Sequence, residues 1–338
     1  MAVKSLSSFA ELAESLGPRI DAALDARTAL ADGCPARLRE AMRYSLLAPG
    51  KRLRPMLALL AAEACGGKTD AAMPAACAVE MVHAYSLIHD DLPAMDDDDL
   101  RRGRPTCHKA FGEAVAILAG DALLTLAFEV LAKEIQPPSV AAACCAALAE
   151  AAGACNLVGG QADDVAAEEG SGLRVQGSAR ITPDWGGSCT ATLGATVQLS
   201  PQRNANAQPQ HNVIAQLESI HCRKTGAMIQ VSLRLGGLVA EADPGQLAAL
   251  DAYGRRLGLA FQITDDLLDV QSTEADAGKR VGKDAQRGKL TFPSLFGLDQ
   301  SAQYAEQLIA EACRAVGSFG SSAEGLRAVA GYVLERNR

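Results

Sequence analysis

Two clusters of aspartates are the residues of this sequence best suited to chemistry. The first is Asp90-Asp91-Leu92-Pro93-Ala94-Met95-Asp96 and the second is Asp265-Asp266-Leu267-Leu268-Asp269. Two sets of carboxylate oxygens suit magnesium, which accepts few carboxylates, keeps several waters and shares phosphate oxygens. The rival for such an acidic run is a calcium-binding EF-hand, but the Asp-x-Asp-x-Asp-Gly spacing and the closing glutamate are missing. The pattern therefore indicates magnesium and phosphate.

The second cluster has the simpler geometry. On a helix Asp265 and Asp269 lie on one face, four residues apart, with Asp266 about 100° away. Like charges at this spacing repel each other unless a cation lies between them. The alternative is a solvated surface face, and the apolar residues on both sides of the cluster disfavour it.

The first cluster cannot form a single helical face. Asp90 and Asp96 are six residues apart, about 240° around a helix, and Pro93 interrupts the turn between them. We expect the helix to end near Leu92 and Asp96 to return from the loop beyond it.

Basic residues accompany both clusters. Each group by itself is more often a solvated patch, but together with two acidic clusters they fit a site that neutralises more than one diphosphate. His83 precedes Asp90 by seven residues on nearly the same face, so it is either a phosphate contact or an ordinary histidine at the edge of the core. The basic groups are Gly50-Lys51-Arg52-Leu53-Arg54-Pro55, Arg101-Arg102-Gly103, Lys224-Thr225, Lys279-Arg280, Lys283 and Lys289.

The elements that position these residues are expected to be helices. Hydrophobic residues make up 49% of the 338 residues but aromatic residues only 4%, and alanine, a strong helix former, dominates many stretches. Helical patterns fill residues 8 to about 170, and a second block runs from Asn212 towards Leu235. Asp243-Pro244 then predicts a helix start, with the helix continuing to about Val270. The expected breaks are Gly17-Pro18, Ala48-Pro49-Gly50, Gly66-Gly67, Arg104-Pro105 and Pro137-Pro138.

Residues 171–211 differ from the rest. This insert is rich in Gly, Gln and Asn, contains one acidic residue and shows no clear periodicity, which predicts a long loop apart from a weak strand-like patch at Thr190 to Leu199. It is either a tolerated surface loop or a gene-model artefact. Because the aspartate clusters on either side serve one site, we expect residues 1–338 to form one domain.

Several classes of protein are disfavoured. A net charge of −8 argues against nucleic-acid binding, which requires a basic face. The ten cysteines include no Cys-x-x-Cys, and the N-terminus has no apolar signal core, so reduced cysteines in a cytosolic protein are expected. Asp121 and Glu129 interrupt the most apolar long stretch, Val115 to Ala132, so we predict no transmembrane span.

The sequence resembles the short-chain trans-prenyl diphosphate synthases, and within them the bacterial farnesyl type. Two aspartate motifs with these basic partners are a specific signature, and the similarity covers nearly all of the chain except the insert. The residues that carry it are Gly50 to Pro55, Glu80 to Arg104, Gly159-Gly160-Gln161 with Asp164, His221 to Gly226, Phe261 to Asp269, and Gly278 to Pro293.

This resemblance implies an all-α bundle of long helices around a deep central cavity, assembled as a homodimer. It implies a transferase that joins isopentenyl diphosphate to dimethylallyl or geranyl diphosphate, using three magnesium ions that manganese can replace. A cytoplasmic location is expected, with a plastid location as the alternative if the N-terminus is incomplete.

Site residues carry over position by position. Asp90, Asp96 and Asp265 resemble direct magnesium ligands, with Asp91, Asp266 and Asp269 assisting. Contacts to the allylic diphosphate are implied for Arg101, Lys224, Thr225, Gln262, Lys279 and Lys289. Contacts to isopentenyl diphosphate are implied for Lys51, Arg54, His83 and Arg102.

Product length depends on the residues below the first motif. Ser86 lies one helical turn below Asp90, with Tyr85 beside it. In the prenyl diphosphate synthases that this sequence resembles, residues at these positions form the floor of the pocket for the growing chain. The bulky Tyr85 favours the C15 product, farnesyl diphosphate, and geranylgeranyl diphosphate (C20) is the alternative.

Two other functions were weighed. A terpene cyclase also ionises an allylic diphosphate, but it would leave the basic residues around Lys51 and His83 unexplained, and the aromatic content is low for a cyclase cavity. A noncatalytic subunit of a prenyl synthase commonly lacks one aspartate motif, whereas both are present here.

Overall fold

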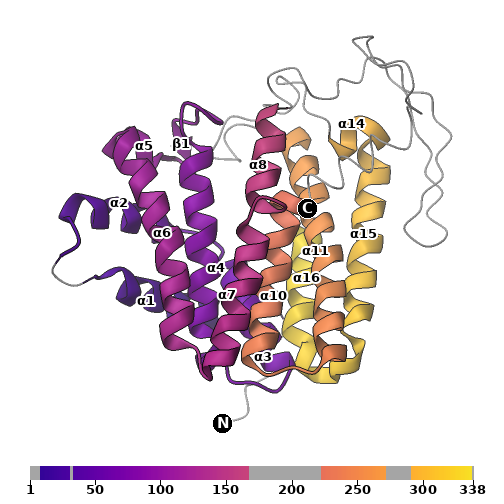
Figure 1. Ribbon diagram of the computed structural model, residues 1–338. Coiled ribbons are helices and arrows are strands. Elements are labelled where there is room, and N and C mark those ends of the chain that lie inside the picture. Colours follow the sequence, from indigo (N-terminus) through magenta and orange to yellow (C-terminus); the bar gives the residue numbers. More distant parts are fainter. Residues whose placement is uncertain (1–7, 31–32, 167–221, 272–290, 337–338) are drawn as a thin grey trace, which may run out of the picture.

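Helices make up nearly all of the computed structural model, which describes residues 8–30, 33–166, 222–271 and 291–336. The predicted insert and the strand-like patch at Thr190 to Leu199 lie outside these residues, as do Asn212, Lys279, Lys283 and Lys289. The long helices run side by side in one bundle (Figure 1). The helices are α1 (Phe9–Thr28), α2 (Ala36–Leu46), α3 (Leu53–Ala64), α4 (Thr69–Asp90), α5 (Cys107–Phe111), α6 (Glu113–Glu134), α7 (Pro138–Ala152), α8 (Leu157–Ala166), η2 (Cys222–Gly226), α10 (Ala227–Val239), α11 (Pro244–Gln271), α14 (Phe292–Phe296), α15 (Leu298–Ala315), η3 (Gly317–Ala323) and α16 (Glu324–Glu335).

Helix α4 lies at the centre of the packing. It contacts α3, α6 and α10, and it is buried on most of its circumference. A helix that is apolar all round is stable only inside a core, where each fully buried large side chain contributes about 1.5–3 kcal/mol. The rigid C-terminal end of α4 is where the first aspartate motif begins.

Most of the predicted helix boundaries are confirmed. Ser8 caps α1 with a reciprocal bond to Glu11, and Asp243 and Gln246 exchange the same pair of bonds at the start of α11. Breaks occur as expected between α2 and α3, after α3, and between α6 and α7.

The predicted break at Gly17-Pro18 is wrong. Helix α1 continues through Pro18. Its apolar residues Leu12, Leu16, Ile20 and Leu24 recur every four residues across the proline and are all buried. Burial of this continuous stripe outweighs the backbone hydrogen bond that Pro18 cannot donate.

One small hairpin was not expected from the sequence. Strands β1 (Leu100–Arg101) and β2 (Arg104–Pro105) are the only strands in the described parts of the chain. The residues of the turn, Arg102 and Gly103, both have positive φ, 52° and 74°. A two-residue strand is too short to show an alternation of apolar and polar residues. Only the turn residues could therefore have predicted this hairpin from the sequence.

Length and composition alone make three segments apolar enough to cross a membrane. They are α4, α6 and the stretch Pro138–Ala166 that contains α7 and α8. The apolar window of α4 is 83% buried inside the bundle, so that helix serves the core. The expectation of no membrane span stays a prediction.

Candidate active site

The first aspartate motif is folded by its own backbone. Helix α4 ends at Asp90, and the following loop turns back so that the Asp96 amide donates to the Asp90 carbonyl at 2.8 Å. The Asp98 amide likewise donates to the Asp91 carbonyl at 3.2 Å. These bonds place Asp96 beside the helix end, so the predicted return of this residue from the loop is confirmed.

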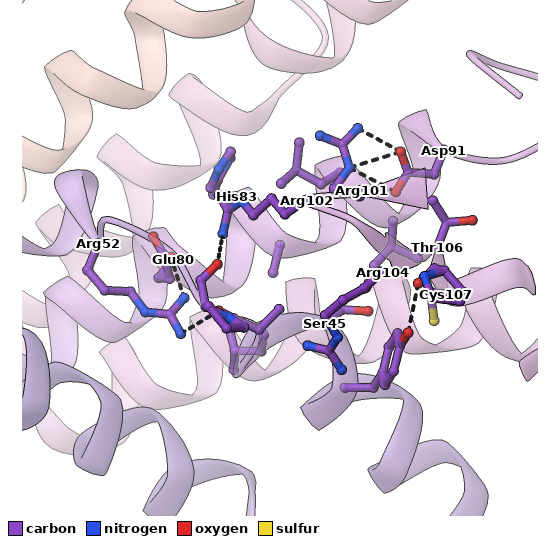
Figure 2. Close-up of a pocket in the computed structure, with 18 residues that line it drawn as sticks. Ser45, Arg52, Glu80, His83, Asp91, Arg101, Arg102, Arg104, Thr106 and Cys107 are labelled. Atoms are coloured by element: carbon purple, nitrogen blue, oxygen red, sulfur yellow. Dashed lines mark hydrogen bonds and ion pairs between the residues drawn. The ribbon is translucent and has the colours of Figure 1, made fainter. Parts of the chain in front are cut away.

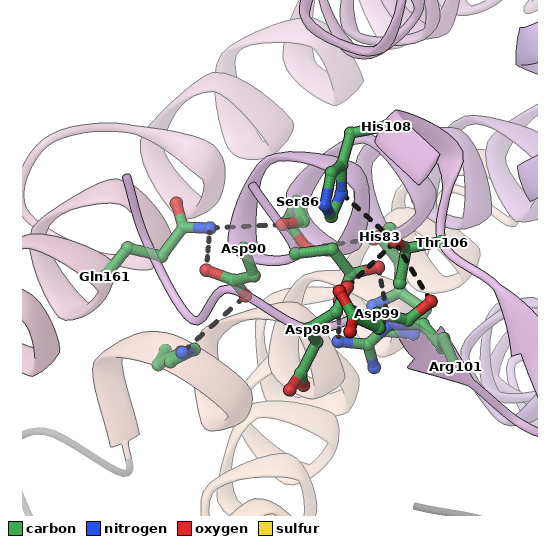
Figure 3. Close-up of polar contacts among 11 residues, drawn as sticks. His83, Ser86, Asp90, Asp98, Asp99, Arg101, Thr106, His108 and Gln161 are labelled. Carbon is green, nitrogen blue, oxygen red and sulfur yellow. Dashed lines mark hydrogen bonds and ion pairs between the residues drawn. The ribbon is translucent and has the colours of Figure 1, made fainter. Parts of the chain in front are cut away.

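Asp90 is a buried carboxylate that meets two other elements. Gln161 of α8 donates from Nε2 to the Asp90 carboxylate at 2.9 Å and to the Ser86 carbonyl at 3.4 Å (Figure 3). Lys224 Nζ lies 3.6 Å from the other carboxylate oxygen. Burial raises the pKa of Asp90, while Lys224 opposes the shift. A buried carboxylate held next to a single ammonium is well suited to take up a further cation.

Lys224 is positioned by the π-helical turn η2 and by α8. Its ammonium lies 2.7 Å from the Asp164 carboxylate. Burial alone would lower the pKa of Lys224, but Asp90 and Asp164 raise it above its ordinary value, so this side chain is a permanent cation. Gly160 allows the close approach, because a Cβ there would lie only 2.9 Å from the Lys224 amide nitrogen.

The neighbouring residue, Thr225, connects the turn to the second motif. Its hydroxyl donates to Gln262 Oε1 at 3.0 Å, and Gln262 Nε2 donates to Asp266 at 3.2 Å. Turn η2 therefore directs Lys224 towards the first aspartate motif and Thr225 towards the second. Asp266 is buried, and it also accepts the Phe292 amide at 3.1 Å, which fixes the start of α14.

Asp265 is paired with a residue that the sequence analysis missed. The Arg336 guanidinium, at the end of α16, lies 2.7 Å from the Asp265 carboxylate and 2.8 Å from the Thr264 hydroxyl. It also stacks on the Phe261 ring at 4.0 Å. Seventy-one residues separate the pair, so no sequence periodicity could reveal it. Asp269 lies half-buried one turn further along α11.

The β1–β2 hairpin brings two arginines to the first motif. Arg101 holds Asp91 bidentately, with Nε at 3.0 Å and a terminal nitrogen at 2.6 Å. Burial raises the pKa of Asp91 and Arg101 opposes the shift. Arg102, at the turn, donates to the Pro49 carbonyl at 2.6 Å.

A second group of cations surrounds His83. Arg54 of α3 lies 3.2 Å from His83 Nε2. Burial, together with Arg54 and Arg102, holds the pKa of His83 well below its ordinary range, so the imidazole is neutral. Burial also lowers the pKa of Arg54, while Glu80 and Asp265 oppose that shift.

A pocket opens between the end of α2, α4 and the hairpin (Figure 2). Arg52, held by Glu80 at 2.9 Å, lies at one end, and Arg101, held by Asp91, lies at the other. His83, Arg102 and Arg104 line the space between them. Arginines are suited to binding anions, so this pocket has the type of lining that a phosphate group would require.

Three further predicted residues, Lys51, Tyr85 and Ser86, lie within the described residues. Lys51 is exposed, with its ammonium 5.0 Å from the centre of the Tyr332 ring. Tyr85 is 4% exposed, on α4 below Asp90, and its ring meets His89 edge-on at 5.6 Å. The Ser86 hydroxyl donates to the His83 carbonyl at 2.9 Å. Lys279 and Lys289 lie outside the described residues.

The donor atoms of the two motifs fit a hard divalent cation. Asp90, Asp91 and Asp265 offer only carboxylate oxygens, and each lies beside an internal cation: Lys224, Arg101 and Arg336 respectively. Negative charge at these positions is thus balanced within the chain. A bound metal ion would neutralise these aspartates instead, and Lys224, Arg101 and Arg336 would then be available to an anionic ligand.

Comparison with known proteins gives relatives that cover most of the chain. The family model described as "Polyprenyl synthetase" matches residues 35–181 and 188–320. Farnesyl diphosphate synthase of Geobacillus stearothermophilus is 45% identical over 267 residues, which cover 78% of this chain and 76% of the relative. Geranylgeranyl pyrophosphate synthase 7 of Arabidopsis thaliana, a chloroplastic protein, is 40% identical over 320 residues, or 94% of this chain and 81% of the relative.

Solved structures give the same fold. An FPP/GFPP synthase from Zymomonas mobilis superposes with a TM-score of 0.76 at 35% identity, covering 96% of this chain and 98% of its own. A geranyltransferase from Legionella pneumophila superposes with a TM-score of 0.75 at 30% identity, covering 97% of each chain. The all-α fold and the resemblance drawn from the motifs are both confirmed.

Proposed function

Since the chain belongs to the polyprenyl synthetase family, we propose that it joins isopentenyl diphosphate to dimethylallyl or geranyl diphosphate with farnesyl diphosphate as the main product. The observation that carries this proposal is the presence of two cation groups at the end of α4. Lys224 and Arg101 lie beside the first aspartate motif, and Arg54 and Arg102, next to the neutral His83, form the second group. Two groups fit two diphosphates.

The proposed reaction begins with loss of the allylic diphosphate. Lys224 and Arg101 neutralise the charge that develops on the leaving group as its carbon–oxygen bond breaks. Magnesium ions, held by Asp90, Asp96 and Asp265 with Asp91 and Asp269 assisting, would supply the rest of that neutralisation when bound. We propose three ions, with manganese as a substitute.

The second cation group positions the nucleophile. Arg54, His83 and Arg102 hold isopentenyl diphosphate, so that its double bond attacks the allylic carbon, and a proton is then lost from the new chain. Apolar side chains around the site exclude water, which would otherwise capture the cation.

Tyr85 supports the C15 product. It is buried on α4, five residues before Asp90, and burial, together with the charge of Asp90, raises the pKa of its phenol. A bulky ring there limits the space for a growing chain. The relatives include both farnesyl and geranylgeranyl synthases, so C20 remains the alternative product.

A homodimer is proposed from the surface of α6. Ile117 and Leu118 are 43% and 56% exposed, and a second copy of the chain would cover them. For location we propose the cytoplasm. Thiols stay reduced there, and the cysteines whose side chains the structure describes are free. The plastid is the alternative location, and cell fractionation distinguishes the two.

One assay tests the reaction class and the product together. Purified protein is incubated with magnesium, labelled isopentenyl diphosphate and geranyl diphosphate, and the products are separated by chromatography. A C15 diphosphate supports the proposal, and a C20 diphosphate replaces it with the alternative. Hydrocarbon formed from the allylic substrate alone would indicate a cyclase, and absence of turnover a noncatalytic subunit.

A further inference from the structure

A third group of ligand atoms lies beyond the first aspartate motif. A carboxylate oxygen of Asp97, one of Asp99 and a ring nitrogen of His108 lie within 4.8 Å of one another. Asp97 and Asp99 come from the loop after Asp96, whereas His108 comes from α5 on the far side of the hairpin. None of the three belongs to the aspartates proposed above to hold magnesium.

Thr106 fixes the protonation pattern of this histidine. The Thr106 hydroxyl donates its one hydrogen to the Asp98 carbonyl at 2.8 Å. The contact of 3.1 Å between Thr106 Oγ1 and His108 Nδ1 (Figure 3) must therefore have Nδ1–H as its donor. In the neutral ring this leaves a lone pair on Nε2, which is the form that ligates metals.

That lone pair has no protein partner. His108 is 6% exposed, and its Nε2 is buried without a hydrogen bond to any described residue. A buried polar atom left unsatisfied is destabilising, because it has lost its hydrogen bonds to water and gained none in return. Carboxylate oxygens of Asp97 and Asp99 lie within 4.8 Å of a ring nitrogen of this imidazole, so the ligand that would satisfy the ring and the carboxylates together is a cation.

The remaining charges permit such a cation. Lys109 pairs with Asp99 at 2.7 Å, but both side chains are largely exposed, so the lysine can move into solvent at little cost. Asp97 is exposed and has a positive φ of 47°, an uncommon conformation for a residue other than glycine.

We propose that Asp97, Asp99 and His108 bind a divalent transition-metal ion, with zinc the best fit, at a site separate from the magnesium site. Two carboxylates and one imidazole suit zinc, which binds both oxygen and nitrogen donors and completes its shell with water. Magnesium is disfavoured because it prefers oxygen ligands alone. Thr106 is the outer partner that orients the ligating ring.

The bound ion would brace the hairpin that carries Arg101 and Arg102. It would join the loop before β1 to the helix after β2, where Thr106 already holds the two segments together by donating its amide to the Asp99 carbonyl at 3.0 Å. The role is structural, and its test requires no turnover.

The test measures zinc binding in excess magnesium, which keeps the catalytic aspartates occupied. Protein labelled with ¹⁵N at its five histidines is titrated with zinc, and the ring nitrogens are followed by NMR. Asp97→Asn removes one ligand and keeps a side chain that tolerates positive φ. His108→Asn keeps a donor for Thr106 and removes Nε2. Asp121→Asn, which removes an acid 3.9 Å from His89, is the matched control.

In the wild type we expect the His108 Nε2 resonance to shift with one equivalent of zinc. Asp97→Asn should weaken this binding at least tenfold, His108→Asn should abolish the signal, and Asp121→Asn should leave it unchanged. Since Asp97 is exposed, that variant is expected to fold like the wild type, which circular dichroism checks. An Nε2 resonance that does not respond to zinc, or equal affinity in wild type and Asp97→Asn, would overturn the proposal.

Discussion

Arg336 Nη2 lies 2.7 Å from Asp265 Oδ1, so the end of α16 neutralises the first aspartate of the second motif. The Arg336 side chain is 8% exposed, whereas that of Asp265 is 41% exposed. Asp265 is therefore accessible to a metal ion from solvent, while its carboxylate is paired with a nearly buried arginine.

Replacing Arg336 by glutamine should change both the stability of the protein and its requirement for magnesium. Without metal, the free energy of unfolding should fall by about 1.5–3 kcal/mol, because hydrogen bonds between charged groups are lost. The magnesium concentration for half-maximal turnover should also fall, since no arginine competes for Asp265. Urea denaturation and metal titration measure the two effects. Arg327→Gln, which removes an exposed contact of α16 to the Gly320 carbonyl, is the control; equal magnesium requirements in both variants would contradict the idea.

Lys224→Gln should reduce kcat/KM by about 10²- to 10³-fold, the usual cost of removing one group that stabilises developing negative charge. Arg223→Gln is a matched control, because the adjacent Arg223 pairs with Asp163. Steady-state kinetics with geranyl diphosphate give the comparison. Similar losses in both variants would mean that Lys224 acts only through the structure of η2.

His83 predicts a specific dependence of stability on pH. Its pKa is lowered in the folded protein by burial and by Arg54 and Arg102, so the unfolded chain takes up a proton near pH 6.5 that the folded chain does not. The stabilising contribution is thus present above about pH 6.5 and is lost as the pH falls below it, by up to about 1.4 kcal/mol per pH unit.

Urea denaturation between pH 5 and 7.5 tests this dependence. The wild type should lose stability over this range more steeply than His83→Asn. His89→Asn, at a half-buried position on the same helix, is measured alongside as the comparison for loss of a histidine. Parallel slopes for the wild type and His83→Asn would show that His83 is protonated in the folded protein.

Tyr85→Ala should lengthen the product from C15 to C20 or beyond, because it removes a buried ring below Asp90. The measurement is chromatography of the product alcohols after phosphatase treatment. Tyr304→Ala, which shortens an aromatic side chain on α15, should leave the product length unchanged. An unchanged C15 product in Tyr85→Ala would remove this residue from the account of chain length.

Leu118→Lys should convert the proposed homodimer into monomers at micromolar concentration. A charged side chain at a 56% exposed position costs little in the monomer but is buried and unpaired in a dimer. Light scattering coupled to gel filtration measures the mass. Leu298→Lys, at a 40% exposed position of α15, is the control and should leave the mass unchanged.

The sequence by itself determined the helical fold and the residues around which the site is built. Alanine-rich helices, the Asp243 cap and the interruption of the first motif at Pro93 are local features, and local spacing and capping were enough to predict them. The break expected at Gly17-Pro18 was wrong because packing of the stripe from Leu12 to Leu24 overrides a local preference. The hairpin was missed because two residues per strand leave no periodic signal.

Only the tertiary structure decided which charges meet. The pairing of Arg336 with Asp265, the pairing of Lys224 with Asp164, and the placement of His108 near Asp97 and Asp99 depend on how separate helices and loops pack. Electrostatic interactions and desolvation act through distance and burial in space, whereas capping and periodicity act along the chain. The sequence could therefore single out the two aspartate motifs, but the cations that balance their charge became visible only in the folded protein.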